Sequence, residues 1–144
     1  VSYLSVDETA SLSVPKGSLN QRDRHEIESH VTHSYNFLKI IPWSEHLENV
    51  PEIAYAHHEK MNGKGYPRQL SGDEIPLQSK MMTIADIYDA LTAWDRPYKR
   101  AMPAERALKI LGFEAKDNHI DPELLEIFIG ARLYDLVKRP KVQH

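Results

Sequence analysis

The sequence predicts an all-α fold of about five helices. Apolar residues recur at helical spacing, proline and asparagine or aspartate stand where helices would begin, and no stretch alternates apolar and polar residues as a strand does. At 144 residues, the chain has the usual length of a single domain, so we expect one helical domain over residues 1–144. Residues 1–19 mix Ser, Pro and Gly without a helical period, which predicts an irregular lead-in.

The first helix is predicted from Asn20, a good N-cap residue, up to the break at Pro42. Ile27 and Val31 begin a stripe of apolar residues on one of its faces. At about 100° per residue, His30 falls within this stripe. A histidine on an apolar face is more often a core residue than a ligand, so the stripe alone assigns His30 no chemistry.

The second predicted helix begins at Pro51, a favoured first helical position, and carries the adjacent residues His57 and His58. Imidazole together with carboxylate suits Zn, Fe, Mn, Ni or Co. Consecutive helical residues diverge by about 100°, so the two rings are expected to serve two ions, or one ion and a substrate. The alternative is that both are ordinary polar residues at a helix end. Residues 60–75 follow as a loop whose glycines permit close backbone approach to a ligand.

The central helix is predicted from Pro76 to about Ala93. One of its sides has a stripe of large apolar residues, and the other has Met82 and Ala90 around Asp86. A helix that is apolar on both sides is expected to be buried, and a buried carboxylate needs a cation. For Asp86, that cation is either a metal ion or a basic side chain in a salt bridge.

Two further helices are predicted in the C-terminal part. A basic turn over residues 95–100 precedes a helix that starts at Pro103, and the last helix begins with Asp121 as N-cap and Pro122 as first residue. Apolar residues of this last region are expected to pack and to carry no chemistry: Leu124, Leu125, Ile127, Phe128, Leu133, Leu136 and Val137.

Two stretches of the chain resemble one known family. HHEKMNGKGYP, residues 57–67, looks like the HHE…DGxGYP signature of the HD-GYP family, and ADIYDALTAWDRPYK, residues 85–99, is similar to the segment that follows it there. The match extends in register from about Leu12 to Val137. Members of this family are helical, metal-dependent phosphodiesterases that hydrolyse the bacterial second messenger cyclic di-GMP. The resemblance therefore implies the C-terminal portion of an HD-type helical bundle. Separately, the sequence shows no signal-peptide pattern and no run long enough to cross a bilayer, so we expect a cytoplasmic protein.

The resemblance also implies a site. It would hold divalent transition metals, with Fe or Mn expected, as a two-metal centre in the complete domain, where a bridging hydroxide attacks phosphorus. The implied metal ligands are His30, His57, His58 and Asp86, and the implied contacts to the cyclic dinucleotide are Tyr66, Lys80, Arg96 and Lys99.

The sequence departs from the family pattern at two points. Asn62 stands where the family usually has Asp, so the acceptor is kept and the charge is lost. The His-Asp dyad that gives the family its name does not occur in this sequence. Because that dyad would supply a carboxylate that bridges two metals, the chain by itself is expected to hold half a site and to be inactive.

The composition of the chain limits the classes of partner that we expect it to bind. A net charge of −3, from 18 basic and 21 acidic residues, does not favour a general nucleic-acid or membrane surface, and no apolar run is long enough to cross a bilayer. The expected partners are a cyclic dinucleotide, a diguanylate cyclase at the GYP loop, and a second copy of the chain that covers the central helix. Two alternatives remain open: a degenerate cyclic di-GMP receptor or docking module, and a plain helical domain whose histidines are structural.

Overall fold

The structure, a computed structural model, describes residues 21–93 and 100–136. Arg96, Lys99, Asn20 and the predicted lead-in lie outside the described residues. Within the described ranges, the chain forms five α-helices and three 3₁₀ helices, and it has no strand beyond an isolated bridge between Asn62 and Ser71. The prediction of an all-α fold with about five helices is confirmed. The α-helices are α2 (Gln21–Ile40), α3 (Val50–Tyr55), α4 (Leu77–Thr92), α5 (Ala104–Lys116) and α6 (Pro122–Gly130), and the 3₁₀ helices are η1 (Glu45–Leu47), η2 (Gly72–Glu74) and η3 (Leu133–Asp135).

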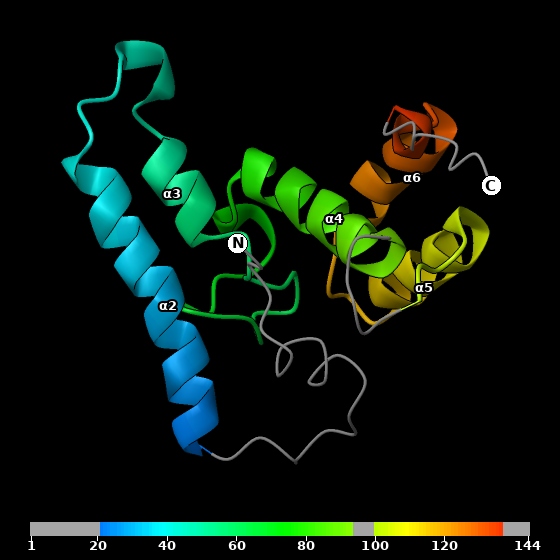
Figure 1. Cartoon of the computed structure of the whole chain (residues 1–144), viewed down its shortest axis with the longest axis horizontal. Coiled ribbons are helices and arrows are strands. Elements are labelled where there is room, and N and C mark those ends of the chain that lie inside the picture. Colours follow the sequence, from blue (N-terminus) through cyan, green and yellow to red (C-terminus); the bar gives the residue numbers. More distant parts are fainter. Residues whose placement is uncertain (1–20, 94–99, 137–144) are drawn as a thin grey trace.

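The helices form two groups that meet at α4. The long helix α2 lies beside α3 at one end of the molecule, while α5 and α6 lie at the other end, with α4 between the two groups (Figure 1). The loop between α3 and α4 carries the glycine-rich stretch. Helices α2 to α4 thus follow one another across the molecule in chain order, and α5 and α6 both lie beyond α4.

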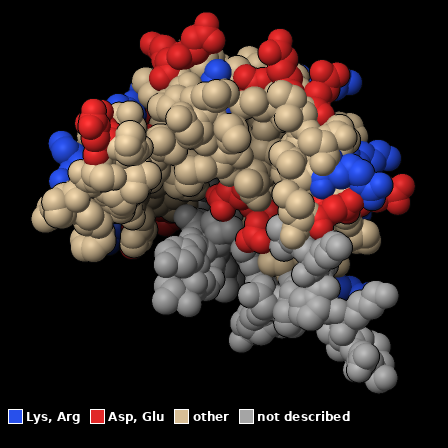
Figure 2. Space-filling view, turned by 90° about the horizontal axis from the view of Figure 1, so that it is seen from above, with Lys and Arg blue, Asp and Glu red and all other residues tan. Residues whose placement is uncertain are grey.

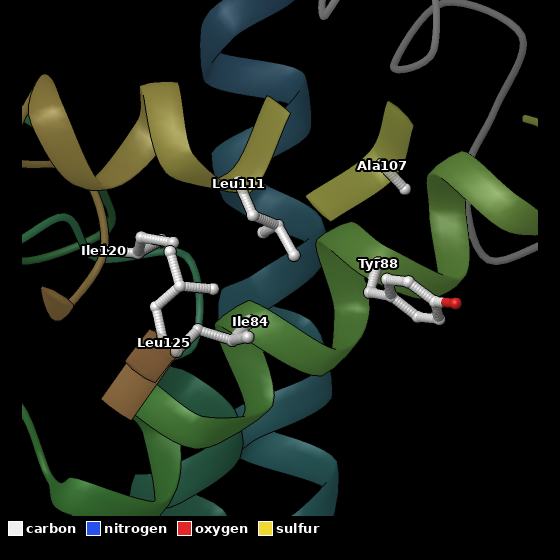
Figure 3. Packing of buried hydrophobic residues seen from close by; sticks show 6 residues of the cluster. All are labelled: Ile84, Tyr88, Ala107, Leu111, Ile120 and Leu125. Carbon is white, nitrogen blue, oxygen red and sulfur yellow. The ribbon is translucent and has the colours of Figure 1, made fainter. Parts of the chain in front are cut away.

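The apolar core lies between α4, α5 and α6. Ile84 of α4 lies next to Leu111 of α5 and Leu125 of α6, and Leu111 has no exposed surface (Figure 3). Tyr88 of α4 belongs to the same cluster. Tyr88 and Phe128 pack edge to face, with ring centroids 5.5 Å apart, which is a favoured aromatic geometry. Burial of these side chains is the main source of stability in this half of the molecule.

Helix ends follow the predicted signals closely. The Asp121 carboxylate accepts hydrogen bonds from the amides of Glu123 and Leu124, and Pro122 is the first residue of α6. Helix α3 begins one residue earlier than predicted, at Val50, with Pro51 inside its first turn.

Three predictions of burial are wrong. Asp86 is exposed, and Met82 on the same side of α4 is 40 % exposed, because that side is covered only towards the C-terminal end of the helix, where Ala90 is buried. His30 is exposed, since α2 packs on α3 through a neighbouring face that includes Val31. Near the C-terminal end, three residues expected to pack are also exposed: Ile127, Leu133 and Leu136.

Much of the surface is uncharged. Figure 2 shows a face on which uncharged side chains predominate, interrupted by small groups of acidic and basic ones. None of the helices in the described ranges combines the length and the apolar character required to span a membrane.

Candidate functional site

The two adjacent histidines follow α3 rather than lie on it. Helix α3 ends at Tyr55, and His57 and His58 stand in the turn after it. The expectation that they project from successive helical positions is therefore wrong. Instead of diverging by a helical step, the two rings lie next to each other, with centroids 3.9 Å apart.

His57 is oriented by its backbone surroundings. Its Nδ1 lies 2.6 Å from the Ala54 carbonyl oxygen, which can only accept, so Nδ1 carries the proton and donates. This leaves Nε2 with a free lone pair, which is the arrangement that orients metal-binding histidines in proteins. The His57 carbonyl accepts from the Thr83 hydroxyl of α4 at 2.7 Å, which ties this turn to the central helix.

His58 is partly buried and stacks on the ring of Tyr66, with centroids 4.9 Å apart and planes 13° apart. Burial and the neighbouring His57 lower the pKa of His58 from 6.5 to about 3. His58 is therefore neutral at pH 7, which is the protonation state that a metal ligand requires. Tyr66 also donates its backbone amide to the His58 carbonyl at 3.3 Å.

Glu59, the next residue, is 2 % exposed and binds the backbone of the loop. Its Oε1 accepts from the Arg68 amide at 2.8 Å, and its Oε2 accepts from the Leu70 amide at 2.9 Å. Both carboxylate oxygens are thus used within the loop that carries Tyr66. Sequence reasoning assigned Glu59 no role. The available signal was that a glycine-containing loop leaves amides without partners, and a buried acid beside it can accept from them.

Close backbone packing and a side-chain amide shape the tip of this loop. A Cβ atom built on Gly65 would lie 2.4 Å from the Lys60 amide nitrogen and 2.6 Å from the His58 carbonyl oxygen, so only glycine fits. Asn62 Oδ1 accepts from the Lys64 amide at 3.0 Å. That bond needs an acceptor but no charge, so the amide serves here as well as the aspartate that the resembled family has.

Lys80, which the resemblance implies as a substrate contact, forms an ion pair with Asp121 instead. Its ammonium lies 3.7 Å from the Asp121 carboxylate, and its side chain is 11 % exposed. Beside this pair is a cavity of about 10 Å³, which is enough for one water molecule. The cavity lies between the loop and the start of α6, and its lining consists of Glu59, Met61, Ile75, Lys80, Thr83, His119, Ile120 and Asp121.

A polar network joins α2 to α3 and the loop. Tyr35 of α2 donates to Glu52, Glu52 forms an ion pair with Arg68 at 3.1 Å, and Arg68 lies over the ring of Tyr55 at 4.8 Å. Tyr35 and Tyr55 stack with centroids 4.2 Å apart. The hydrogen bond to Glu52 raises the pKa of Tyr35. These contacts fix the helix that carries His30 relative to the loop that carries Tyr66.

The structure brings together only some of the implied site residues. His57, His58 and Tyr66 form one cluster, while His30 and Asp86 lie on exposed helix faces. Within residues 21–93 and 100–136, no three His, Asp or Glu side chains form a group that could hold a metal ion. Two adjacent imidazoles fit part of the donor set of a divalent transition metal. The four-ligand assignment stays a prediction.

The amino-acid sequence of the chain matches a known protein family. The HD domain family matches residues 7–124, and the chain belongs to it. HD domains are generally metal-dependent. Within this class, the chain is related to the cyclic dinucleotide phosphodiesterases of the HD-GYP type.

Several relatives are similar over most of the chain. A 3'3'-cGAMP-specific phosphodiesterase 3 of Vibrio cholerae is 41 % identical over 108 residues, which cover 74 % of this chain and 22 % of the relative. A cyclic di-GMP phosphodiesterase of the same species is 44 % identical over 87 residues, 60 % of this chain and 17 % of the relative. A cyclic di-GMP phosphodiesterase of Thermotoga maritima is 32 % identical over 128 residues, 87 % of this chain and 34 % of the relative. The chain thus spans between 17 and 34 % of the length of these relatives.

Proposed function

We propose that the chain is part of a metal-dependent phosphodiesterase that hydrolyses a cyclic dinucleotide, with cyclic di-GMP as the expected substrate. The observation that carries the proposal is the cluster of His57, neutral His58 and Tyr66 in a chain of the HD domain family. His57 and His58 would bind metal, and the ring of Tyr66 beside them would contact the substrate. Such metal ions lower the pKa of a bound water and stabilise developing charge.

Five other residues complete the proposed site. His30 and Asp86 are the remaining metal ligands, and Arg96 and Lys99 would meet phosphate groups, for which guanidinium is well suited. Lys80 remains a proposed substrate contact, and its ammonium would have to leave Asp121 to take that role.

Binding and turnover test this proposal separately. Calorimetry on the 144-residue chain with Mn²⁺ and cyclic di-GMP should give binding that His58→Gln abolishes. The matched pair on α2 is His30→Gln and His33→Gln, because both side chains are exposed and only His30 is a proposed ligand. Weakened metal binding in His30→Gln alone supports the ligand set, whereas equal behaviour of the two variants removes His30 from it.

Turnover is compared between this chain and a longer one in which a His-Asp segment of the family precedes residue 1. We expect hydrolysis with Mn²⁺ or Fe²⁺ by the longer chain only, since a single ion cannot stabilise both the attacking and leaving oxygens. If the longer chain hydrolyses 3'3'-cGAMP faster than cyclic di-GMP, the proposed substrate changes from cyclic di-GMP to 3'3'-cGAMP. Dinucleotide binding without turnover in the longer chain would favour the receptor or docking function, including docking of a diguanylate cyclase at the loop.

A self-association surface belongs to the same proposal. Leu77, Met81 and Met82 of α4 are 57, 52 and 40 % exposed, and an apolar surface of this kind is often covered by a partner. Light scattering should show a dimer that Met81→Glu dissociates. A wild-type chain that stays monomeric at high concentration contradicts this part.

A further inference from the structure

Three consecutive residues shortly after α3, His57, His58 and Glu59, differ in kind. His57 and His58 present rings to the site, whereas Glu59 is 2 % exposed and its two oxygens accept only from the backbone of the loop. A buried carboxylate is costly unless hydrogen bonds satisfy it, so these two bonds determine where the loop can lie. The question is what this arrangement does for the site.

The two amides that Glu59 binds lie on the far side of the site residue Tyr66. Glu59 itself is adjacent to His58, and it reaches forward to Arg68 and Leu70, nine and eleven residues away. Residues 60–67 are thereby closed into a ring of chain whose ends are held by one side chain. Inside that ring, the Tyr66 amide bonds the His58 carbonyl, and the Tyr66 ring stacks on His58.

We propose that Glu59 is a positioning residue that holds the Tyr66 ring against His58 by fixing the amides of Arg68 and Leu70. It contacts neither metal nor substrate in this role and acts through the loop. The consequence for the site rests on the proposed function, in which Tyr66 meets the cyclic dinucleotide. The placement of the loop itself does not depend on that function.

The loop offers an internal signature of this role. The amides of Arg68 and Leu70 each bond one Glu59 oxygen, whereas the Gln69 amide between them bonds no other described residue. Amide hydrogen exchange by NMR on the ligand-free 144-residue chain should therefore show slow exchange at 68 and 70 and fast exchange at 69. If the amides of residues 68, 69 and 70 exchange equally fast in the wild-type chain, the proposal is wrong, and no variant is needed to show it.

Glu59→Gln is the direct variant. Glutamine has the same shape, but its amide group donates, so it can accept from only one of the two backbone amides. We expect exchange at Arg68 or Leu70 to become about tenfold faster or more, and the nuclear Overhauser effect between the His58 and Tyr66 rings to weaken. Cyclic di-GMP binding, where present, should weaken while metal binding is retained.

The matched control is Glu74→Gln. Glu74 also accepts from a backbone amide of the same loop, that of Ser71 at 3.0 Å, but it is exposed and bonds no residue near Tyr66. It should leave the ring contact and the exchange at Arg68 and Leu70 unchanged. Equal effects of the two variants, or an unchanged ring contact in Glu59→Gln, would overturn the proposal.

A conservative variant covers the case in which Glu59→Gln does not fold. Glu59→Asp retains two accepting oxygens on a shorter side chain, so it should restore part of the slow exchange and part of the ring contact. An Asp variant that folds, yet whose two amides exchange as fast as Gln69, with the ring contact intact, would also overturn it. The exchange and ring-contact readouts use no dinucleotide, so failure of the proposed function leaves them interpretable.

Discussion

The two halves of the molecule are held together by different forces. Between α4, α5 and α6, contacts are almost entirely apolar, and Leu111 and Ala107 have no exposed surface. Around α2, α3 and the loop, the contacts are polar: Tyr35 with Glu52, and Glu59 with two amides. The first half supplies burial, which is non-directional. The second supplies hydrogen bonds, which fix directions.

This difference separates stability from the candidate site. His57, His58 and Tyr66 all lie in the polar half, where each is oriented by a backbone group or a neighbouring ring. Substitutions in the apolar half should therefore change the free energy of unfolding and spare the arrangement of the site. Substitutions in the polar half should disturb the arrangement of the site, whether or not they also change the free energy of unfolding. The following predictions test that division, beginning with the largest expected effect.

The largest effect concerns the proton affinity of His58 in the metal-free chain. A pKa lowered from 6.5 to about 3 means that the folded chain binds this proton about 3,000-fold more weakly than the unfolded chain. Between these two pH values, the unfolded state binds more protons, so stability falls as the pH is lowered from 6.5 towards 3. NMR titration of the His58 ring checks the pKa directly.

The control for that prediction is His58→Gln, which removes the ring. Its free energy of unfolding should fall less than that of the wild type over the same pH range. A His58 ring that titrates near 6.5, with parallel pH profiles for both proteins, would contradict it.

In the apolar half, Leu111→Ala should have the next largest effect. Leu111 is fully buried, and truncation of such a residue costs about 2–5 kcal/mol through lost transfer energy and the remaining cavity. Urea denaturation measures the loss. The ring contact between His58 and Tyr66 should persist in the folded fraction, and its disappearance would show that the two halves are not separable.

Gly65→Ala tests the polar half by steric means. The new Cβ would lie 2.4 Å from the Lys60 amide nitrogen, so the loop must shift, at a cost of about 1–3 kcal/mol. The matched variant is Gly112→Ala on α5, where the Cβ meets nothing within 4 Å and helix propensity adds about 0.5–1 kcal/mol of stability. Thermal unfolding should show opposite signs. A neutral Gly65→Ala would mean that the loop is not tightly packed.

The sequence predicted local features better than tertiary ones. The cap at Asp121 and the first residue Pro122 depend only on neighbours along the chain, and both are confirmed. The burial of His30 and Asp86 was inferred from helical periodicity, which identifies a face but not the element that covers it. The role of Glu59 depends on amides nine and eleven residues away, in a loop whose path no periodicity encodes.

The smallest predicted effect concerns an ion pair at the contact between the halves. Asp121 begins α6 in the apolar half, and it meets Lys80 beside the cavity that Glu59 of the polar half also lines. Asp121→Ala should cost about 1 kcal/mol through loss of the helix cap. Asp121→Asn keeps an equally good cap and removes the charge, so its loss relative to the wild type reports the ion pair, and the difference between the two variants reports the cap.

The coupling energy between Lys80 and Asp121 shows how much this ion pair contributes to the contact between the halves. At 3.7 Å and 11 and 17 % exposure, the pair is less screened than a surface pair, yet its separation is long, so we expect about 0.5–1 kcal/mol. A double-mutant cycle of Asp121→Asn with Lys80→Met measures it in urea denaturation. Coupling within error of zero would mean that Lys80 is free to leave Asp121 at no cost, which is the condition its proposed contact with substrate requires. A coupling of about 1 kcal/mol would instead mean that the ion pair helps to hold α4 against α6. A contact between Lys80 and substrate would then have to compensate for the loss of that pair.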